Sequence, residues 1–207
     1  MTITVWSDIR CPFCYIAKRK LENAISQFNH KDEVVVEWKS FELDPRLETN
    51  TKMNTIDYYV SKGASRQQMT DLFSNATRMA KEVGITFNLN EIIVANSFKA
   101  HKLVHVAKTI NKQNEAKELL LKAYFTDGEN IDDANVLLQI GENLGFSKEN
   151  LEDKLSDKSL EVSIREDQEL AKEVGVSGVP FFVFNNKQAL SGAQSEETFL
   201  EMIKKTY

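Results

Sequence analysis

The stretch TITVWSDIRCPFCYIAKRKLENAISQF, residues 2–28, sets out the fold of this chain. Its first six residues alternate β-branched and aromatic side chains in the pattern of a strand. From Pro12 onward apolar residues recur at helical spacing, and a proline is tolerated in the first helical turn because its missing N–H is not needed there. The stretch therefore predicts a strand, a turn at residues 8–10 and a helix, with Cys11 and Cys14 at the junction.

Cys11 and Cys14 are the two cysteines of the chain, and their Cys-x-x-Cys spacing has four interpretations. The pair is half of a zinc site, a structural disulfide, two inert core thiols or a dithiol that cycles between reduced and oxidised states. A structural zinc site needs two further Cys or His ligands. A disulfide that closes so small a loop gains the least entropically. The spacing lets the sulfurs bond with tolerable strain, so redox cycling is favoured.

The other candidate metal ligands do not complete a site, and no metal is predicted. His101 and His105 have the i, i+4 spacing of a metal pair, but the glutamate of an H-E-x-x-H motif is missing. The acidic segment DGENIDD, residues 127–133, has its glycine at the wrong place for a calcium loop. Asp132 is better interpreted as the N-cap of the next helix.

Composition narrows the class of protein. The 207 residues carry a net charge of −5, and Lys and Arg are spread among acidic residues, so no nucleic-acid partner is predicted. No apolar run approaches the ~20 residues of a membrane span. The N-terminal residues lack the basic and apolar stretches of a secretory signal, so a cytoplasmic location is expected. In that reducing compartment a cysteine pair is more often catalytic, redox-sensing or metal-binding than a permanent disulfide.

The order of predicted elements indicates an α/β fold. A second strand covers residues 34–43, and strand patterns return at 179–184 and 187–192, before a last helix at 195–205. The segment between them is helical in pattern, with helices expected at about 65–83, 97–111, 115–125, 132–144 and 158–174. This order predicts a thioredoxin fold with a large all-helical domain inserted in its middle. Residues 1–50 and 176–207 form the thioredoxin-like domain, and 51–175 form the insert.

The charged residues near the cysteines have predicted roles. Cys11, the exposed first cysteine at the helix start, is expected to be favoured as a thiolate by the free backbone N–H groups and the helix dipole. Arg10 is a possible helper. Asp8 either influences thiol ionisation or caps the turn. Glu37 and Lys39 share one face of the second strand and are interpreted as solvent-facing, the alternative being a buried proton relay to Cys14.

Four segments carry a resemblance: SDIRCPFC (7–14), NSFKAHKL (96–103), AYFTDGENI (123–131) and GVSGVPFFVFNNKQALSGAQ (175–194). Together they resemble the FrnE-like branch of the DsbA family of thiol–disulfide oxidoreductases. The resemblance implies that Cys11 attacks, that Cys14 resolves the mixed disulfide, and that Pro180 is a cis-proline beside them. It also implies that the backbone of Val179 pairs with an extended substrate, for which Pro12 and Phe13 are further predicted contacts.

The same structural family includes kappa-class glutathione transferases and 2-hydroxychromene-2-carboxylate isomerases, which typically carry Ser at the position of Cys11. A glutathione-dependent transferase or isomerase and a redox-sensing binding module are therefore the alternatives. If the protein is a glutathione-dependent enzyme, Asn96, Ser97 and His101 are expected to face the cleft between domains. The expected partners are protein or small-molecule thiols and disulfides, and glutathione is a possible reductant or substrate. No metal or organic cofactor is expected, the chain is a monomer or homodimer, and the direction of exchange is open.

Overall fold

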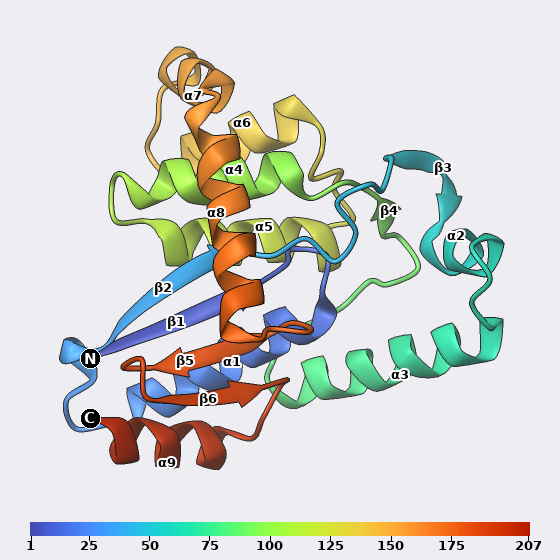
Figure 1. Cartoon of the computed structure of the whole chain (residues 1–207). Coiled ribbons are helices and arrows are strands. Elements are labelled where there is room, and N and C mark those ends of the chain that lie inside the picture. Colours follow the sequence, from blue (N-terminus) through green and yellow to red (C-terminus); the bar gives the residue numbers. More distant parts are fainter. The chain divides into compact units, whose positions relative to one another are not determined.

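The computed structural model describes residues 1–207 and divides into two compact units (Figure 1). The first unit consists of Met1–Leu43 and Lys158–Tyr207, and the second of Asp44–Asp157. The second unit thus interrupts the first in sequence, which is the organisation predicted for an inserted domain.

The first unit is built on a four-stranded mixed sheet of order β2-β1-β5-β6. β1 pairs in parallel with β2, whereas β5 is antiparallel to both β1 and β6. This is the strand arrangement of the predicted thioredoxin fold. The elements are β1 (Thr2–Ser7), α1 (Pro12–Ser26), a 3₁₀ turn (Lys31–Glu33), β2 (Val35–Ser40), α8 (Ser159–Val174), β5 (Phe181–Phe184), β6 (Gln188–Ser191) and α9 (Glu196–Thr206).

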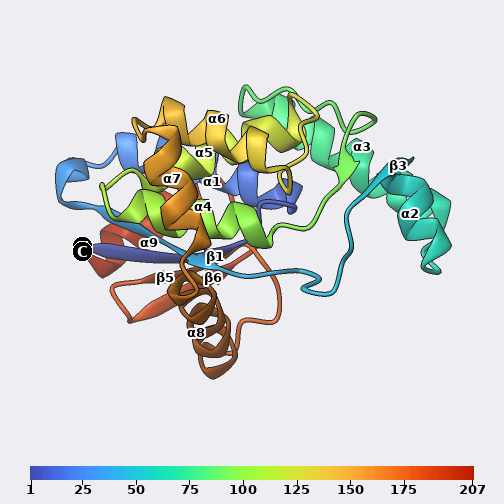
Figure 2. The same ribbon diagram turned by 90° about the horizontal axis from the view of Figure 1, so that it is seen from above.

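Helices cover both faces of this sheet because its strands are apolar on both sides. α1 packs against α9 on one face, and α8 lies on the opposite face from α1 (Figure 2). The first face buries Ile3, Val5, Phe182 and Phe184 completely. Burying a side chain of this size contributes roughly 1.5–3 kcal/mol, so this layer supplies much of the unit's stability.

The position of α8 differs from the predicted domain boundaries, which assigned residues 158–175 to the insert. The Trp6 indole N–H donates to the Asp167 carbonyl at 2.9 Å, and the Ser40 N–H donates to the Asp167 carboxylate at 2.8 Å. Ala171 is fully buried in an apolar cluster with Trp6. These contacts place α8 in the first unit, and a helical pattern by itself does not tell which unit a helix joins.

The second unit is mainly helical, as predicted, and also contains short elements that the sequence did not indicate. Its elements are β3 (Asn50–Asn54), α2 (Thr55–Ser61), α3 (Arg66–Glu82), β4 (Ile93–Val94), α4 (Phe98–Lys108), α5 (Gln113–Phe125), α6 (Ala134–Asn143) and α7 (Lys148–Ser156). The elements without a predicted counterpart are α2, α7 and the two-stranded sheet of β3 and β4. Gly141 lets α6 approach α7 closely, since a Cβ there would collide with Leu151.

Side-chain caps define several helix starts. The Ser65 and Ser195 hydroxyls accept backbone N–H groups at the starts of α3 and α9, in line with the sequence. The N-cap of α6 is Asp133, whose side chain accepts the N–H of Asn135, and not Asp132 as predicted. The Asp132 carboxylate instead accepts the Thr49 hydroxyl at 2.6 Å. The two adjacent aspartates compete for one cap, and a tertiary contact takes one of them.

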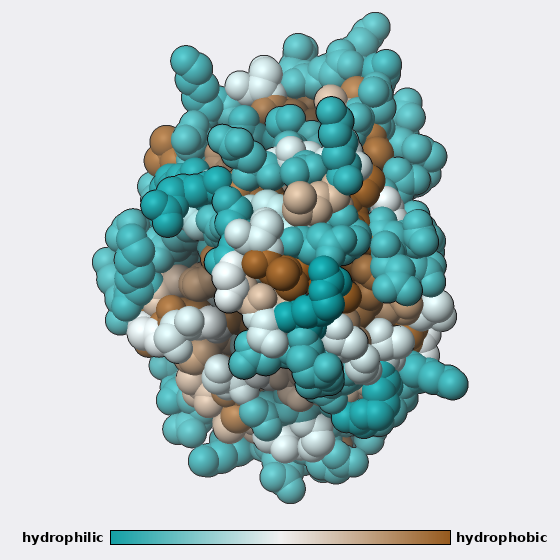
Figure 3. All heavy atoms as spheres, turned by 90° about the vertical axis from the view of Figure 1, so that its right-hand side faces the viewer, coloured by the Kyte–Doolittle hydropathy of each residue, from teal (hydrophilic) through white to brown (hydrophobic).

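The surface is largely polar where it can be seen from the right-hand side of Figure 1. Hydrophilic side chains cover most of this face, and apolar atoms show between them (Figure 3). No helix is long and apolar enough to cross a membrane.

Candidate active site

The structure places the two cysteines at the N-terminus of α1. Cys11 is the N-cap residue, with an extended backbone, and Pro12 is the first residue of the helix. The Cys11 N–H donates to the Asp8 carbonyl at 3.3 Å, and the Cys14 N–H donates to the Cys11 carbonyl at 3.0 Å. Both cysteines are free thiols. The turn and the first helical hydrogen bond thus hold the two side chains at one end of the helix.

Cys11 is buried, and in this respect the sequence prediction was wrong. Its exposed fraction is 5%, against 1% for Cys14, so both thiols are shielded and Cys11 is the slightly more accessible of the two. The cause is the segment before β5, which lies over the thiol: the Cys11 Sγ donates to the Val179 carbonyl at 3.5 Å. These residues are 168 positions apart in sequence, so local pattern gave no sign of the contact.

The segment that covers Cys11 contains the predicted cis-proline. The Val179–Pro180 bond is cis, which confirms the expectation from the resemblance. The Pro180 carbonyl accepts the Gly192 N–H at 2.8 Å, which ties this segment to the end of β6. Pro180 is buried, whereas Val179 is half-buried, as are Pro12 and Phe13 beside the cysteines. The structure therefore brings Cys11 together with Val179 and Pro180 from the far end of the chain.

The pKa of the Cys11 thiol is raised well above its ordinary value. The largest cause is the hydrogen bond with the Cys14 side chain, followed by burial and the charge of Cys14; the Asp8 carboxylate adds to the rise. The backbone N–H of Cys14 acts in the opposite direction, as expected for a helix N-terminus, but it is outweighed. The sequence-based expectation of a favoured thiolate considered the helix terminus and the nearby charges, and it missed the burial and the Cys14 side chain.

The raised pKa predicts how Cys11 alkylation depends on pH. Only the thiolate reacts, so the rate with iodoacetamide should rise about tenfold per pH unit between about pH 6 and 8, without a plateau. Peptide mapping by mass spectrometry after timed quenches would give the rate at Cys11 alone, with free glutathione as the reference thiol. A plateau below about pH 7 would show instead that the helix terminus dominates.

A buried carboxylate holds the turn that precedes Cys11. Asp8 is fully buried, and one of its carboxylate oxygens accepts the Arg10 N–H at 3.2 Å. The other accepts the Leu43 N–H at 2.8 Å, from the residues that follow β2. Asp8 thus caps the turn and also raises the pKa of Cys11, so both predicted roles are present. The help expected from Arg10 stays a prediction.

Glu37 and Lys39 are half-buried rather than simply solvent-facing. The Lys39 ammonium lies 3.1 Å from the Asp167 carboxylate and 3.5 Å from that of Glu37. Burial lowers the pKa of Lys39, but the two carboxylates outweigh it and the net shift is upward. Asp167 was not singled out in the sequence. The sequence pattern could have indicated Asp167, because it lies three residues after Ile164 and four before Ala171, on the buried face of α8.

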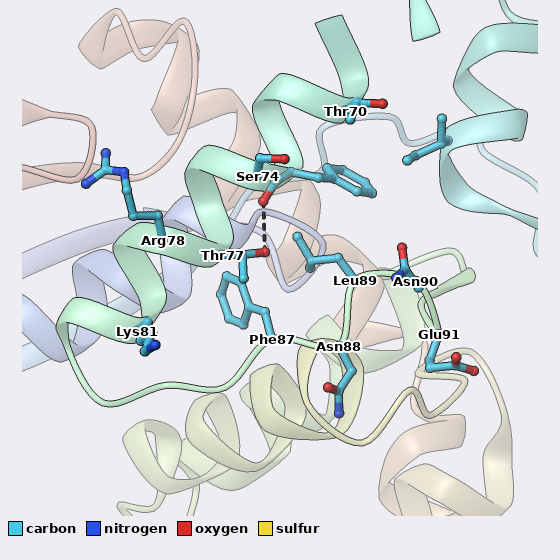
Figure 4. A pocket seen from close by; sticks show the side chains of 12 residues that line it. Thr70, Ser74, Thr77, Arg78, Lys81, Phe87, Asn88, Leu89, Asn90 and Glu91 are labelled. Atoms are coloured by element: carbon cyan, nitrogen blue, oxygen red, sulfur yellow. Dashed lines mark hydrogen bonds between the residues drawn. The ribbon is translucent and has the colours of Figure 1, made fainter. Parts of the chain in front are cut away.

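The second unit contains a cavity of about 690 Å³, formed by α3 and the segment that precedes β4 (Figure 4). Its apolar lining includes Phe73, Phe87 and Leu89, and Thr70 and Ser74 add hydroxyls along α3. The Thr77 hydroxyl donates a hydrogen bond to the Phe73 carbonyl at 2.9 Å, within α3 (Figure 4). No cysteine or histidine lines this cavity, so it does not supply thiol chemistry.

The remaining predicted residues lie in the second unit. Ser97 is the N-cap of α4, and His101 is buried on that helix. The Asn96 side chain accepts the Phe98 N–H at 2.7 Å and donates to the Leu47 carbonyl at 2.8 Å, which gives it a structural role. Their expected position in a ligand cleft stays a prediction. No group of three or more His, Cys, Asp or Glu side chains is placed to hold a metal ion.

Comparison with known proteins identifies relatives of the whole chain. Residues 2–204 match the model of the DSBA-like thioredoxin domain family. The protein YwbO of Bacillus subtilis is 26% identical over 203 residues, which cover 97% of this chain and 94% of YwbO.

Solved structures agree with this assignment. A probable DsbA oxidoreductase from Streptomyces coelicolor is 28% identical, with a TM-score of 0.91 over 100% of this chain and 89% of that one. The cytosolic disulfide reductase DsbM of Pseudomonas aeruginosa has a TM-score of 0.71 at 17% identity, over 99% of this chain and 98% of its own, and it has also been solved with glutathione. At that identity the second likeness concerns the fold alone.

Proposed function

Because this chain belongs to the DSBA-like thioredoxin domain family and is a disulfide oxidoreductase, we propose that Cys11 attacks substrate disulfides and Cys14 resolves the mixed disulfide. The observation that supports this most is the position of the dithiol at the N-terminus of α1, with the Cys11 Sγ against the Val179 carbonyl beside cis-Pro180. Of the two cysteines, Cys11 is the less buried residue, which suits the attacking role.

The exchange proceeds in two steps. The Cys11 thiolate attacks one sulfur of a substrate R–S–S–R′, forms the disulfide Cys11–S–S–R, and releases R′S⁻, which takes up a proton. Cys14 then loses its proton and attacks the Cys11 sulfur, which forms the Cys11–Cys14 disulfide and releases RS⁻. Two electrons have passed from the dithiol to the substrate. A thiol reductant such as glutathione restores the dithiol, and no metal or organic cofactor takes part.

Substrate binding is assigned to the half-buried residues around the dithiol. Val179 lies two residues before β5 and is half-buried, and we propose that its backbone pairs with an extended segment of substrate. Pro12 and Phe13 offer apolar contact next to the sulfurs. The proposed substrates are protein or small-molecule disulfides.

The raised pKa of Cys11 supports the reductive direction. A strongly oxidising pair owes its potential to a stabilised reduced form, usually a thiolate of low pKa. Here the hydrogen bond with the Cys14 side chain and the burial disfavour the thiolate, and Pro12 and Phe13 bring no cation. We therefore propose that this protein acts as a reductase in the cytosol, the role by which DsbM is described.

The test is the reduction potential of the Cys11–Cys14 pair in a glutathione redox series, with insulin reduction assayed alongside. We expect reversible oxidation, turnover of insulin, and a potential nearer to about −270 mV than to about −120 mV. A potential near the second value would reverse the proposed direction. A pair that forms no disulfide, or forms one without any turnover, would contradict dithiol exchange.

A further inference from the structure

We propose that Asp8 is a positioning residue for Cys11: its buried carboxylate ties the segment after β2 to the turn that carries the thiol, and its negative charge disfavours a thiolate there. This inference rests on the proposed function of Cys11.

The hydrogen bonds of Asp8 hold the turn that carries the Cys11 thiol. Asp8 lies between β1 and α1, and its own carbonyl accepts the Cys11 N–H at 3.3 Å. Its carboxylate accepts the Arg10 N–H from the same turn and the Leu43 N–H from the segment after β2. One side chain thus joins two segments that are 35 residues apart in sequence. Any movement of this carboxylate moves the backbone that carries Cys11.

The negative charge of Asp8 opposes ionisation of the Cys11 thiol. The side chain is fully buried, so solvent screens its charge weakly. A Cys11 thiolate would add a second negative charge nearby, and the Asp8 carboxylate accordingly opposes ionisation of the thiol, together with Cys14. Asp8 thus adds to the Cys14 side chain and to burial in favouring the thiol form of Cys11. Because the thiolate is the attacking species, this carboxylate contributes to a low basal reactivity of the site.

The test compares three variants by the pH profile of Cys11 alkylation. In Asp8→Asn, which keeps the shape and removes the charge, we expect the profile to move to lower pH. Thiolate at pH 7 rises about tenfold per pH unit of this shift, and the lower nucleophilicity of a more acidic thiol reduces the gain in rate of disulfide exchange to about threefold per unit. Asp8→Glu, which keeps the charge and shifts the hydrogen bonds, should retain the high pKa.

The matched control is Asp167→Asn. Asp167 is also buried and also accepts a backbone N–H near the end of β2, that of Ser40, but it is not among the groups that raise the pKa of Cys11. Asp167→Asn should lose stability to an extent similar to that of Asp8→Asn, and it should leave the pH profile of Cys11 alkylation unchanged. Thermal unfolding of each variant establishes that it is folded at the assay temperature.

Two results would overturn the proposal. One is an Asp8→Asn profile that coincides with that of the wild type. The other is an equal shift in Asp8→Glu, because that variant keeps the charge and the charge of Asp8 would then not account for the shift. If Asp8→Asn does not fold, Asp8→Glu can still contradict the proposal, because a charge effect requires that variant to keep the high pKa. Alkylation needs no turnover, so these outcomes are independent of whether insulin is reduced.

Discussion

A Cys11→Ser variant is expected to lose at least about 10³-fold in kcat/KM for insulin reduction. A serine hydroxyl does not ionise near neutral pH and cannot form a disulfide with the substrate, so the first step is removed. Cys14 cannot replace it, because that side chain is 1% exposed. The measurement is the rate of insulin precipitation with dithiothreitol, corrected for the rate without protein.

The loss must come from chemistry rather than from unfolding. Serine is slightly smaller than cysteine, and its hydroxyl can keep the contact with the Val179 carbonyl. We therefore expect the thermal unfolding of Cys11→Ser to resemble that of the wild type. A folded variant that retains more than a tenth of the activity would move the attacking role away from Cys11.

Cys14→Ser is expected to give the second-largest effect, with a different signature. Cys11 still attacks, but no second thiol resolves the product, so the protein should accumulate a mixed disulfide with one substrate chain per molecule. Turnover of insulin should fall on the order of 10²-fold, since the remaining resolution depends on external thiol. Mass spectrometry without reductant measures the trapped species, and added dithiothreitol should release it.

The same variant separates the alternatives. A glutathione transferase needs only the thiol at position 11, so conjugation of glutathione to an electrophile would survive the loss of Cys14. A redox-sensing module would show no turnover in either form. Cys14→Ser also removes the hydrogen bond that contributes most to the high pKa of Cys11. Its alkylation profile should therefore move to lower pH, although its turnover is lost.

Much of the architecture was predictable because it depends on local patterns. The β1–α1 junction, the caps at Ser65 and Ser195 and the helical insert each follow from a few neighbouring residues. The short elements β3, β4, α2 and α7 were not predicted individually, because segments of this length carry too little periodic signal. Likewise, Asp132 and Asp133 are equally good caps in sequence, and only the Thr49 hydroxyl distinguishes them.

By itself, the sequence determined the thioredoxin fold with its helical insert and the pair Cys11 and Cys14 at a helix N-terminus, since period-2 and period-3.6 patterns and cysteine spacing are local properties. Only the tertiary structure decided how these thiols behave. Hydrogen bonds join Cys11 to Val179, Asp8 to Leu43 and Ser40 to Asp167. These partners are 168, 35 and 127 residues apart in the sequence. Burial and neighbouring charge set a thiol's pKa, and both come from residues distant in the chain.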